Sequence, residues 1–95
     1  MIRDEVIGLI NKGESEHTKF KENFDKESIE TAAAFANTRG GNIFIGYDNS
    51  GKLKGVQIGK ETTNNWANQI SQATEPRIIP DIEEIKIEGK SIAII

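Results

Sequence analysis

The sequence predicts a small single α+β domain, residues 1–95, with helices packed on a mixed or antiparallel sheet. Three observations support this class. A chain of 95 residues has room for one hydrophobic core. Apolar residues recur at helical or at strand spacing in successive segments, in the order α-β-α-β-β-α-β-β. The sequence contains no cysteine and no long apolar run, which excludes a disulfide-stapled domain and a membrane-spanning protein.

The first dozen residues predict an amphipathic helix that ends near Gly13. Its apolar side chains fall at i, i+4, i+7 and i+8, namely at Ile2, Val6, Leu9 and Ile10. From Glu16 to Glu22 the pattern changes to alternation, which is typical of a strand with one buried face. We expect Phe20 to point into the core, and Lys19 and Lys21 to point outward.

A second helix follows, for which Asp25 is placed as the N-terminal cap. Its apolar stripe is narrow and consists of Ile29, Ala32, Ala33 and Ala36. The helix is expected to end at residues 38–41, because Gly40 and Gly41 can take a left-handed conformation that other residues resist. Residues 43–45 then predict a buried strand, and the turn at 48–51 leads into a second strand, Lys52–Gln57, to form a hairpin.

The next segment, from about Lys60 to Thr74, predicts a polar helix with Trp66 and Ile70 on its apolar side. At this spacing Trp66 is expected in the core and not on a surface that stacks bases. Two proline residues, at positions 76 and 80, break the chain after this helix.

Two closing strands complete the predicted sheet. Ile85 and Ile87 alternate with charged residues, Gly89-Lys90 forms a turn, and Ser91–Ile95 is the last strand. The sequence stops on Ala93-Ile94-Ile95, an apolar strand with no polar turn after it. Natural domains usually cover such a strand or place charges along its edge. We therefore expect the domain to be excised from a longer protein, or else its natural end to be tucked into the sheet.

The charge is unevenly distributed along the chain. The formal net charge is −3, but the segment from His17 to Lys60 carries seven cations and five acids, while both flanks are acidic. A locally basic segment is compatible with a small patch that faces phosphates, and also with an ordinary solvated surface. No signal peptide is visible at the N-terminus, so we place the protein in the cytoplasm.

Two blocks carry a family likeness: GESEHTKFK at residues 13–21 and AFANTRGGNIFIGYD at residues 34–48, followed by Gly51 and Gly55. Together they resemble the Schlafen AlbA-type domain, which occurs in bacterial proteins described as transcriptional regulators and in the vertebrate Schlafen proteins. The resemblance implies a small α+β domain, likened to the archaeal chromatin protein Alba, that binds DNA in bacteria.

In the Schlafen branch the same resemblance implies an RNA-cutting site made of three carboxylates. Carried over to this chain, the first falls on Glu14, the third on Asp48, and the second on Lys19. An ammonium group offers no acceptor to a hard cation such as Mg²⁺ and repels it. We therefore expect no catalysis, no metal and no other cofactor, with Glu14 and Asp48 acting as ordinary turn and surface acids.

The glycine pair follows a helix and precedes a strand, whereas phosphate-cradling loops run from strand through glycines to helix. The two glycines are therefore expected to cap the helix, and Arg39 is the group of this loop that could reach a phosphate. His17 is expected to be an exposed histidine on the lysine face of its strand.

The leading hypothesis is a nucleic-acid-binding module of a transcriptional regulator, with DNA preferred over RNA. The expected phosphate contacts are Lys19, Lys21, Arg39, Lys52 and Lys54. Lysines on strands and hairpins fix position and do not read sequence, so no base readout is expected. Two alternatives remain open: a metal-dependent nuclease built on Glu14 and Asp48, and a non-catalytic dimerisation or interaction domain. A symmetric homodimer is also expected, because an Alba-like face needs two lobes.

Overall fold

The computed structural model describes residues 1–38, 40–75 and 77–95. Within them the chain forms three helices and four strands. Their bounds are α1 Arg3–Lys12, β1 Thr18–Lys21, α2 Lys26–Ala36, β2 Asn42–Ile45, α3 Thr62–Ala73, β3 Glu83–Ile87 and β4 Lys90–Ile94. The predicted α+β class is confirmed. None of these helices is long and apolar enough to cross a membrane.

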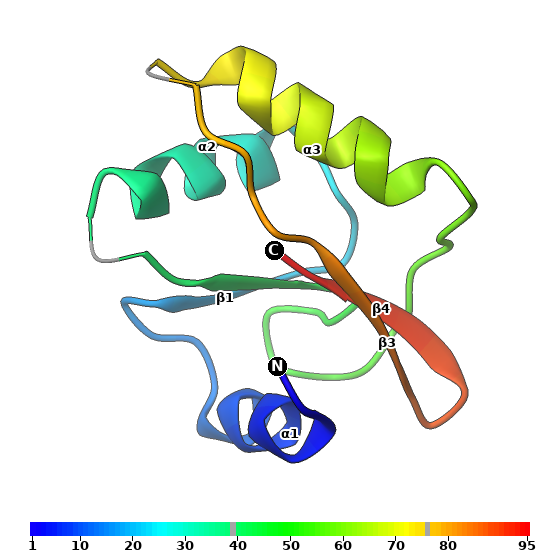
Figure 1. The fold of residues 1–95 in the computed structure, drawn as a ribbon. Coiled ribbons are helices and arrows are strands. Elements are labelled where there is room, and N and C mark those ends of the chain that lie inside the picture. Colours follow the sequence, from blue (N-terminus) through cyan, green and yellow to red (C-terminus); the bar gives the residue numbers. More distant parts are fainter. Residues whose placement is uncertain (39, 76) are drawn as a thin grey trace.

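The four strands form one mixed sheet in the order β1-β2-β4-β3. β1 and β2 are parallel and are joined through α2, whereas β4 is antiparallel to both of its neighbours. Figure 1 shows the three layers that result: α1 below the sheet, and α2 with α3 above it. The edge strands are β1 and β3.

Each face of the sheet has its own core. On the α1 face, Phe20 and Phe44 are buried with Val6, their rings meeting edge to face with centroids 6.1 Å apart. On the other face, Ile43 and Ile45 are buried with Ile70 of α3 and with part of α2. Because successive side chains of a strand point to opposite faces, the continuous apolar run in β2 is buried on both sides.

Both predicted ends of α2 are confirmed. The Asp25 side chain accepts a hydrogen bond from the Ser28 amide at 3.0 Å, which satisfies one of the free N–H groups of the first turn. At the other end, Gly40 has a φ of 87° and its amide donates to the carbonyl of Phe35 at 3.0 Å. This closing bond requires the left-handed conformation that glycine adopts without strain.

The predicted strand over Lys52–Gln57 is reduced to a single bridge between Tyr47 and Leu53. The physical reason is that β2 already has β1 on one side and β4 on the other. The segment therefore cannot pair with β2 along its length, and its amides bond instead to the carbonyls of Gly46 and Ser91.

The other predicted elements are found with small shifts. The closing hairpin turns at Glu88 and Gly89, which have φ values of 52° and 78°, so the turn lies one residue earlier than expected. Trp66 belongs to the core on the α2 and α3 face and stacks on Phe24, with centroids 4.8 Å apart. The prediction that this ring packs inside is confirmed.

Candidate nucleic-acid interface

The two predicted lysines of β1 lie on the face of the sheet opposite Phe20. In the parallel register Lys19 is beside Ile43 and Lys21 is beside Ile45. This is the face covered by α2 and α3, and both lysine residues are only partly exposed. The alternation was predicted correctly, but the expectation that these side chains point freely outward is wrong, because this sheet is covered on both faces.

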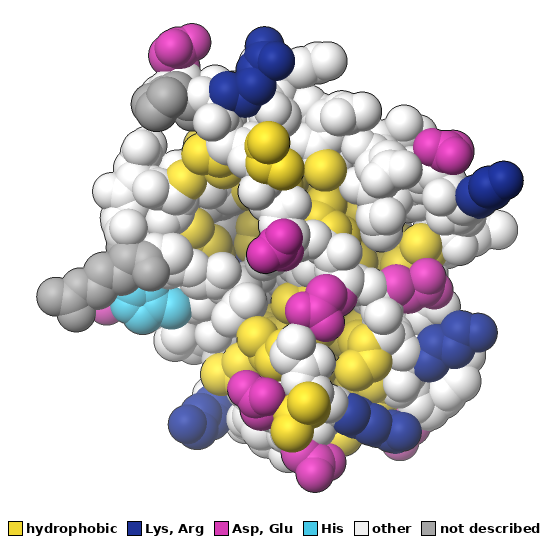
Figure 2. Space-filling model, in the orientation of Figure 1, with side chains coloured by type: hydrophobic (Ala, Val, Ile, Leu, Met, Phe, Trp, Pro, Cys, Tyr) yellow, Lys and Arg dark blue, Asp and Glu magenta, His cyan; other side chains and the backbone are white. Residues whose placement is uncertain are grey.

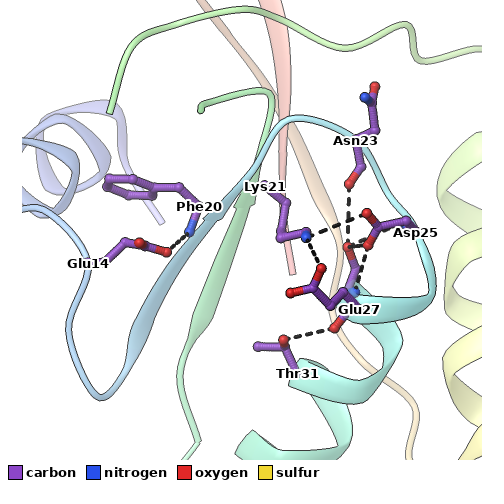
Figure 3. A network of polar contacts seen from close by, with 8 residues as sticks. Glu14, Phe20, Lys21, Asn23, Asp25, Glu27 and Thr31 are labelled. Carbon is purple, nitrogen blue, oxygen red and sulfur yellow. Dashed lines mark hydrogen bonds and ion pairs between the residues drawn. The ribbon is translucent and has the colours of Figure 1, made fainter. Parts of the chain in front are cut away.

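Lys21 is held by two carboxylates of the segment that begins α2. Its ammonium lies 3.2 Å from Glu27 Oε2 and 3.5 Å from Asp25 Oδ2, and its side chain is 18% exposed (Figure 3). Burial acts to lower the pKa of Lys21. The hydrogen bond to Glu27 and the two negative charges outweigh it, so the pKa lies above its ordinary value. The charge is therefore permanent but already neutralised locally.

Lys52 and Lys54 are both exposed and lie on either side of Leu53, which packs against the α1-side core. Backbone hydrogen bonds fix the segment: the Lys54 amide donates to the Gly46 carbonyl at 2.7 Å, and the Asp48 amide donates to the Lys52 carbonyl at 3.0 Å. Neither ammonium forms an ion pair with another described residue. Among the predicted cations that the structure describes, these two are the most exposed.

The same glycine connects this segment to β1, because the Gly46 amide donates to the carbonyl of Lys21 at 2.7 Å. Lys21 and Lys54 therefore lie on two sides of the chain as it leaves β2. The tertiary structure thus places the backbone of the 52–54 segment beside the end of β1, across Gly46.

Arg39 lies outside the described residues. Its neighbours define the loop: the His17 ring is exposed, and its Nδ1 atom lies 2.9 Å from the carbonyl oxygen of Gly40. A Cβ atom on Gly41 would lie 2.8 Å from the His17 carbonyl oxygen. The second glycine is therefore required by the close approach of two backbones, which is a structural role.

Both acids of the expected nuclease pattern are engaged by the backbone. Glu14 Oε2 accepts a hydrogen bond at 3.0 Å from the amide of Phe20, on the outer edge of β1 (Figure 3). Asp48 Oδ1 accepts from the Ser50 hydroxyl at 2.6 Å and from the Lys52 amide at 3.0 Å. These hydrogen bonds, with the Ser50 hydroxyl contributing most, hold the pKa of Asp48 below its ordinary value.

An open hollow of about 530 Å³ lies beyond the carboxyl ends of β1 and β2, lined by residues 21–23, Asp25 and residues 48–50. Its ionisable groups are three carboxylates and one ammonium that is already paired, so its own field does not favour a phosphate. In the described part of the chain, no three His, Cys, Asp or Glu residues are grouped so that they could hold a metal ion.

The charges on the visible face are interspersed. Figure 2 shows Lys, Arg, Asp and Glu side chains alternating over this face, without a single continuous basic area.

The sequence analysis did not predict the ion pair of Lys21, although Asp25 follows it by four residues. Asp25 was assigned only as a helix cap. Its Oδ1 atom does cap α2, but its Oδ2 atom forms the ion pair with Lys21.

Comparison with known proteins gives one family. The sequence profile of the family described as Schlafen, AlbA_2 matches residues 14–95. Searches of curated proteins and of solved structures each found no match.

Proposed function

The chain belongs to the Schlafen, AlbA_2 family, and from this premise we propose that it is a DNA-binding module of a transcriptional regulator that grips phosphates without catalysis. The observation that carries the proposal is the pair of exposed lysine residues, Lys52 and Lys54, on a segment fastened to Gly46. Two cations on an anchored segment can meet a phosphate backbone without the entropic cost of ordering a loop.

Lys19 of β1 joins this pair in the proposal, because it is partly exposed and forms no ion pair with another described residue. Lys21 has a different role in the proposal. Since Asp25 and Glu27 already neutralise it, a phosphate would have to displace carboxylates to reach it. We therefore assign phosphate contact to Lys19, Lys52 and Lys54, and assign Lys21 to positioning the start of α2.

The absence of catalysis is also part of the proposal. The backbone hydrogen bonds to Glu14 and Asp48 explain both acids without a metal, and Lys19 occupies the remaining position of the family's carboxylate pattern. A metal-bound nucleophile needs oxygen ligands that this lysine does not supply.

The test is a titration of duplex DNA and of single-stranded RNA at several salt concentrations. Two or three phosphate contacts predict a slope of log K against log salt of about −2 to −3 on duplex DNA. Lys52→Ala with Lys54→Ala should flatten the slope by up to about two units and weaken binding equally for unrelated sequences.

The matched control is Lys12→Ala with Lys60→Ala, which removes the same charge from exposed positions outside this segment. The control should leave the slope near its original value. If both double variants change the slope equally, binding reflects overall charge, and the proposed interface is wrong.

A further inference from the structure

The two edge strands of the sheet differ in how their outer edges are occupied. On β1, the Phe20 amide donates to Glu14 Oε2 at 3.0 Å, and the Ser15 amide donates to the Thr18 carbonyl at 2.9 Å. These bonds use backbone groups that an added strand would need. The outer edge of β1 is therefore closed by residues of the same chain.

The outer edge of β3 is open. The Ser91 carbonyl of β4 accepts a hydrogen bond from the Val56 amide at 2.9 Å, so it is turned away from β3. Backbone groups alternate sides along an antiparallel pair, so Lys86, opposite Ser91, and Glu84, two residues earlier, direct their amides and carbonyls away from β4. Both residues are exposed, and no other described residue bonds to these backbone groups. β3 therefore offers two donors and two acceptors to an added strand.

The surroundings of this edge are acidic. Residues 81–88 contain four acids and one lysine residue, which are Asp81, Glu83, Glu84, Glu88 and Lys86. The Met1 ammonium pairs with Glu83 at 2.9 Å, which leaves three acids against Lys86. Figure 2 shows acidic side chains in the middle of this face, over the start of β3. The edge therefore attracts a basic partner and repels a nucleic acid.

We propose that the outer edge of β3 binds an extended, basic segment of a partner protein, which adds to the sheet as a strand antiparallel to β3. Antiparallel pairing is slightly more stable per residue than parallel pairing. In this arrangement the partner residues opposite Glu84 and Lys86 each exchange two backbone hydrogen bonds with β3. Main-chain bonds of this kind supply the affinity of strand addition, and side chains supply its specificity.

The side chains of β3 define which segment fits. Ile85 is partly buried and packs against the α1-side core, so an apolar residue opposite it extends that core. A lysine residue opposite Glu84 forms a cross-strand pair of opposite charge. A purely apolar strand is disfavoured, because it would take the charges of Glu84 and Lys86 out of water. The matching segment therefore has alternating apolar and polar residues and carries a net positive charge.

A second copy of this chain fits the edge less well. It would bring two acidic edges together, in molecules that each carry a formal net charge of −3. The proposed edge is also independent of the proposed DNA binding, because it depends on backbone groups and acids of β3 and not on Lys52 or Lys54.

The experiment titrates the full chain, labelled with ¹⁵N, with a blocked peptide of sequence KVTVKTVK. In the antiparallel register its central valine lies opposite Ile85 and its central lysine opposite Glu84. One strand covers far less than the roughly 800 Å² per partner of a stable complex, so we expect a Kd of about 0.1–1 mM. Binding should slow the hydrogen exchange of the Glu84 and Lys86 amides several-fold, and should weaken as salt is added.

Two control peptides separate strand addition from attraction between charges. The first has N-methyl groups on the two residues opposite Glu84 and Lys86, which removes the backbone donors and keeps the charge. It should bind at least tenfold more weakly. The second has glutamate in place of each lysine residue and should not bind.

The matched variants of the chain are Lys86→Pro and Lys86→Ala, each checked for unchanged thermal unfolding. Both lose the same charge, but only proline removes the outward amide hydrogen, which an edge strand tolerates. Lys86→Ala should bind the peptide at least as tightly as the unmodified chain, and Lys86→Pro at least tenfold more weakly than Lys86→Ala.

Two results with the unmodified chain would overturn the proposal: unchanged exchange of the Glu84 and Lys86 amides at 2 mM peptide, or equal binding of the N-methylated peptide. The same conclusion follows if these amides are protected at high protein concentration without peptide, since a second copy then occupies the edge. No nucleic acid is present in these experiments, so their outcome is separate from that of the proposed DNA binding.

Discussion

Replacing Gly41 by Ala places a methyl group in a space that the fold does not provide. The added Cβ would lie 2.8 Å from the carbonyl oxygen of His17 and 2.9 Å from two ring atoms of Phe35. The ring can move, but the carbonyl accepts the Asn42 amide at 2.8 Å, so moving it loosens the start of the β1–β2 pair. The φ of Gly41 is not positive, so the cost is one of space and not of backbone strain.

The expected magnitude follows from these contacts. Overpacking costs about 1–3 kcal/mol, and the smaller conformational entropy of the unfolded alanine chain returns about 0.4–1 kcal/mol. We therefore expect Gly41→Ala to lower the free energy of unfolding by about 1–2 kcal/mol. With a urea m-value of about 1 kcal/mol/M for a domain of this size, the midpoint should fall by about 1–2 M.

The matched control is Gly8→Ala. Gly8 lies inside α1, is exposed, and would meet no atom within 4 Å of an added Cβ. The same substitution should there raise the free energy of unfolding by about 0.5–1 kcal/mol, because alanine favours the helix interior. Urea unfolding followed by circular dichroism measures both variants. A Gly41→Ala midpoint equal to or above that of the unmodified chain would refute the role assigned to this close approach.

Three further predictions concern the charged groups around β1. Burial acts to raise the pKa of Asp25, but hydrogen bonds from Ser28 and the charge of Lys21 outweigh it, so the pKa lies below its ordinary value of 3.8. The ionised Asp25 carboxylate therefore stabilises the fold above pH 3.8, and this stabilisation is lost as the pH falls below that value. Asp25→Asn, which keeps the cap, should therefore reduce the loss of urea stability between about pH 5 and pH 2.5; an unchanged loss would contradict this. Lys21→Ala should leave the salt slope of DNA binding unchanged, whereas Lys19→Ala should flatten it by about 0.9, and a flattened slope for Lys21→Ala would show that phosphates displace its carboxylates. The unmodified chain should not cleave DNA or RNA with Mg²⁺ or Mn²⁺; cleavage that disappears with Glu14→Gln would count against the assignment, and activity gained by Lys19→Glu would show that the rest of the family's site is intact.

Local chemistry determined the elements that the sequence predicted well. Asp25 begins α2 through its own side chain, and Gly40 ends it through a conformation that glycine adopts without strain. The alternation around Phe20 placed that ring in the core, and the spacing around Trp66 placed it against the sheet. The ends of a helix and the buried side of an element depend on residues close together in the sequence, so the sequence pattern predicts them directly.

Tertiary structure alone decided what the other segments and side chains do. The Lys52–Gln57 segment has the pattern of a strand, but β1 and β4 already occupy both sides of β2, so it forms one bridge. Lys21 alternates away from Phe20 as predicted, yet the face it reaches lies beneath α2, where Asp25 and Glu27 bind its ammonium. Strand order and the covering of a sheet face depend on residues distant in sequence, and these set which cations remain free.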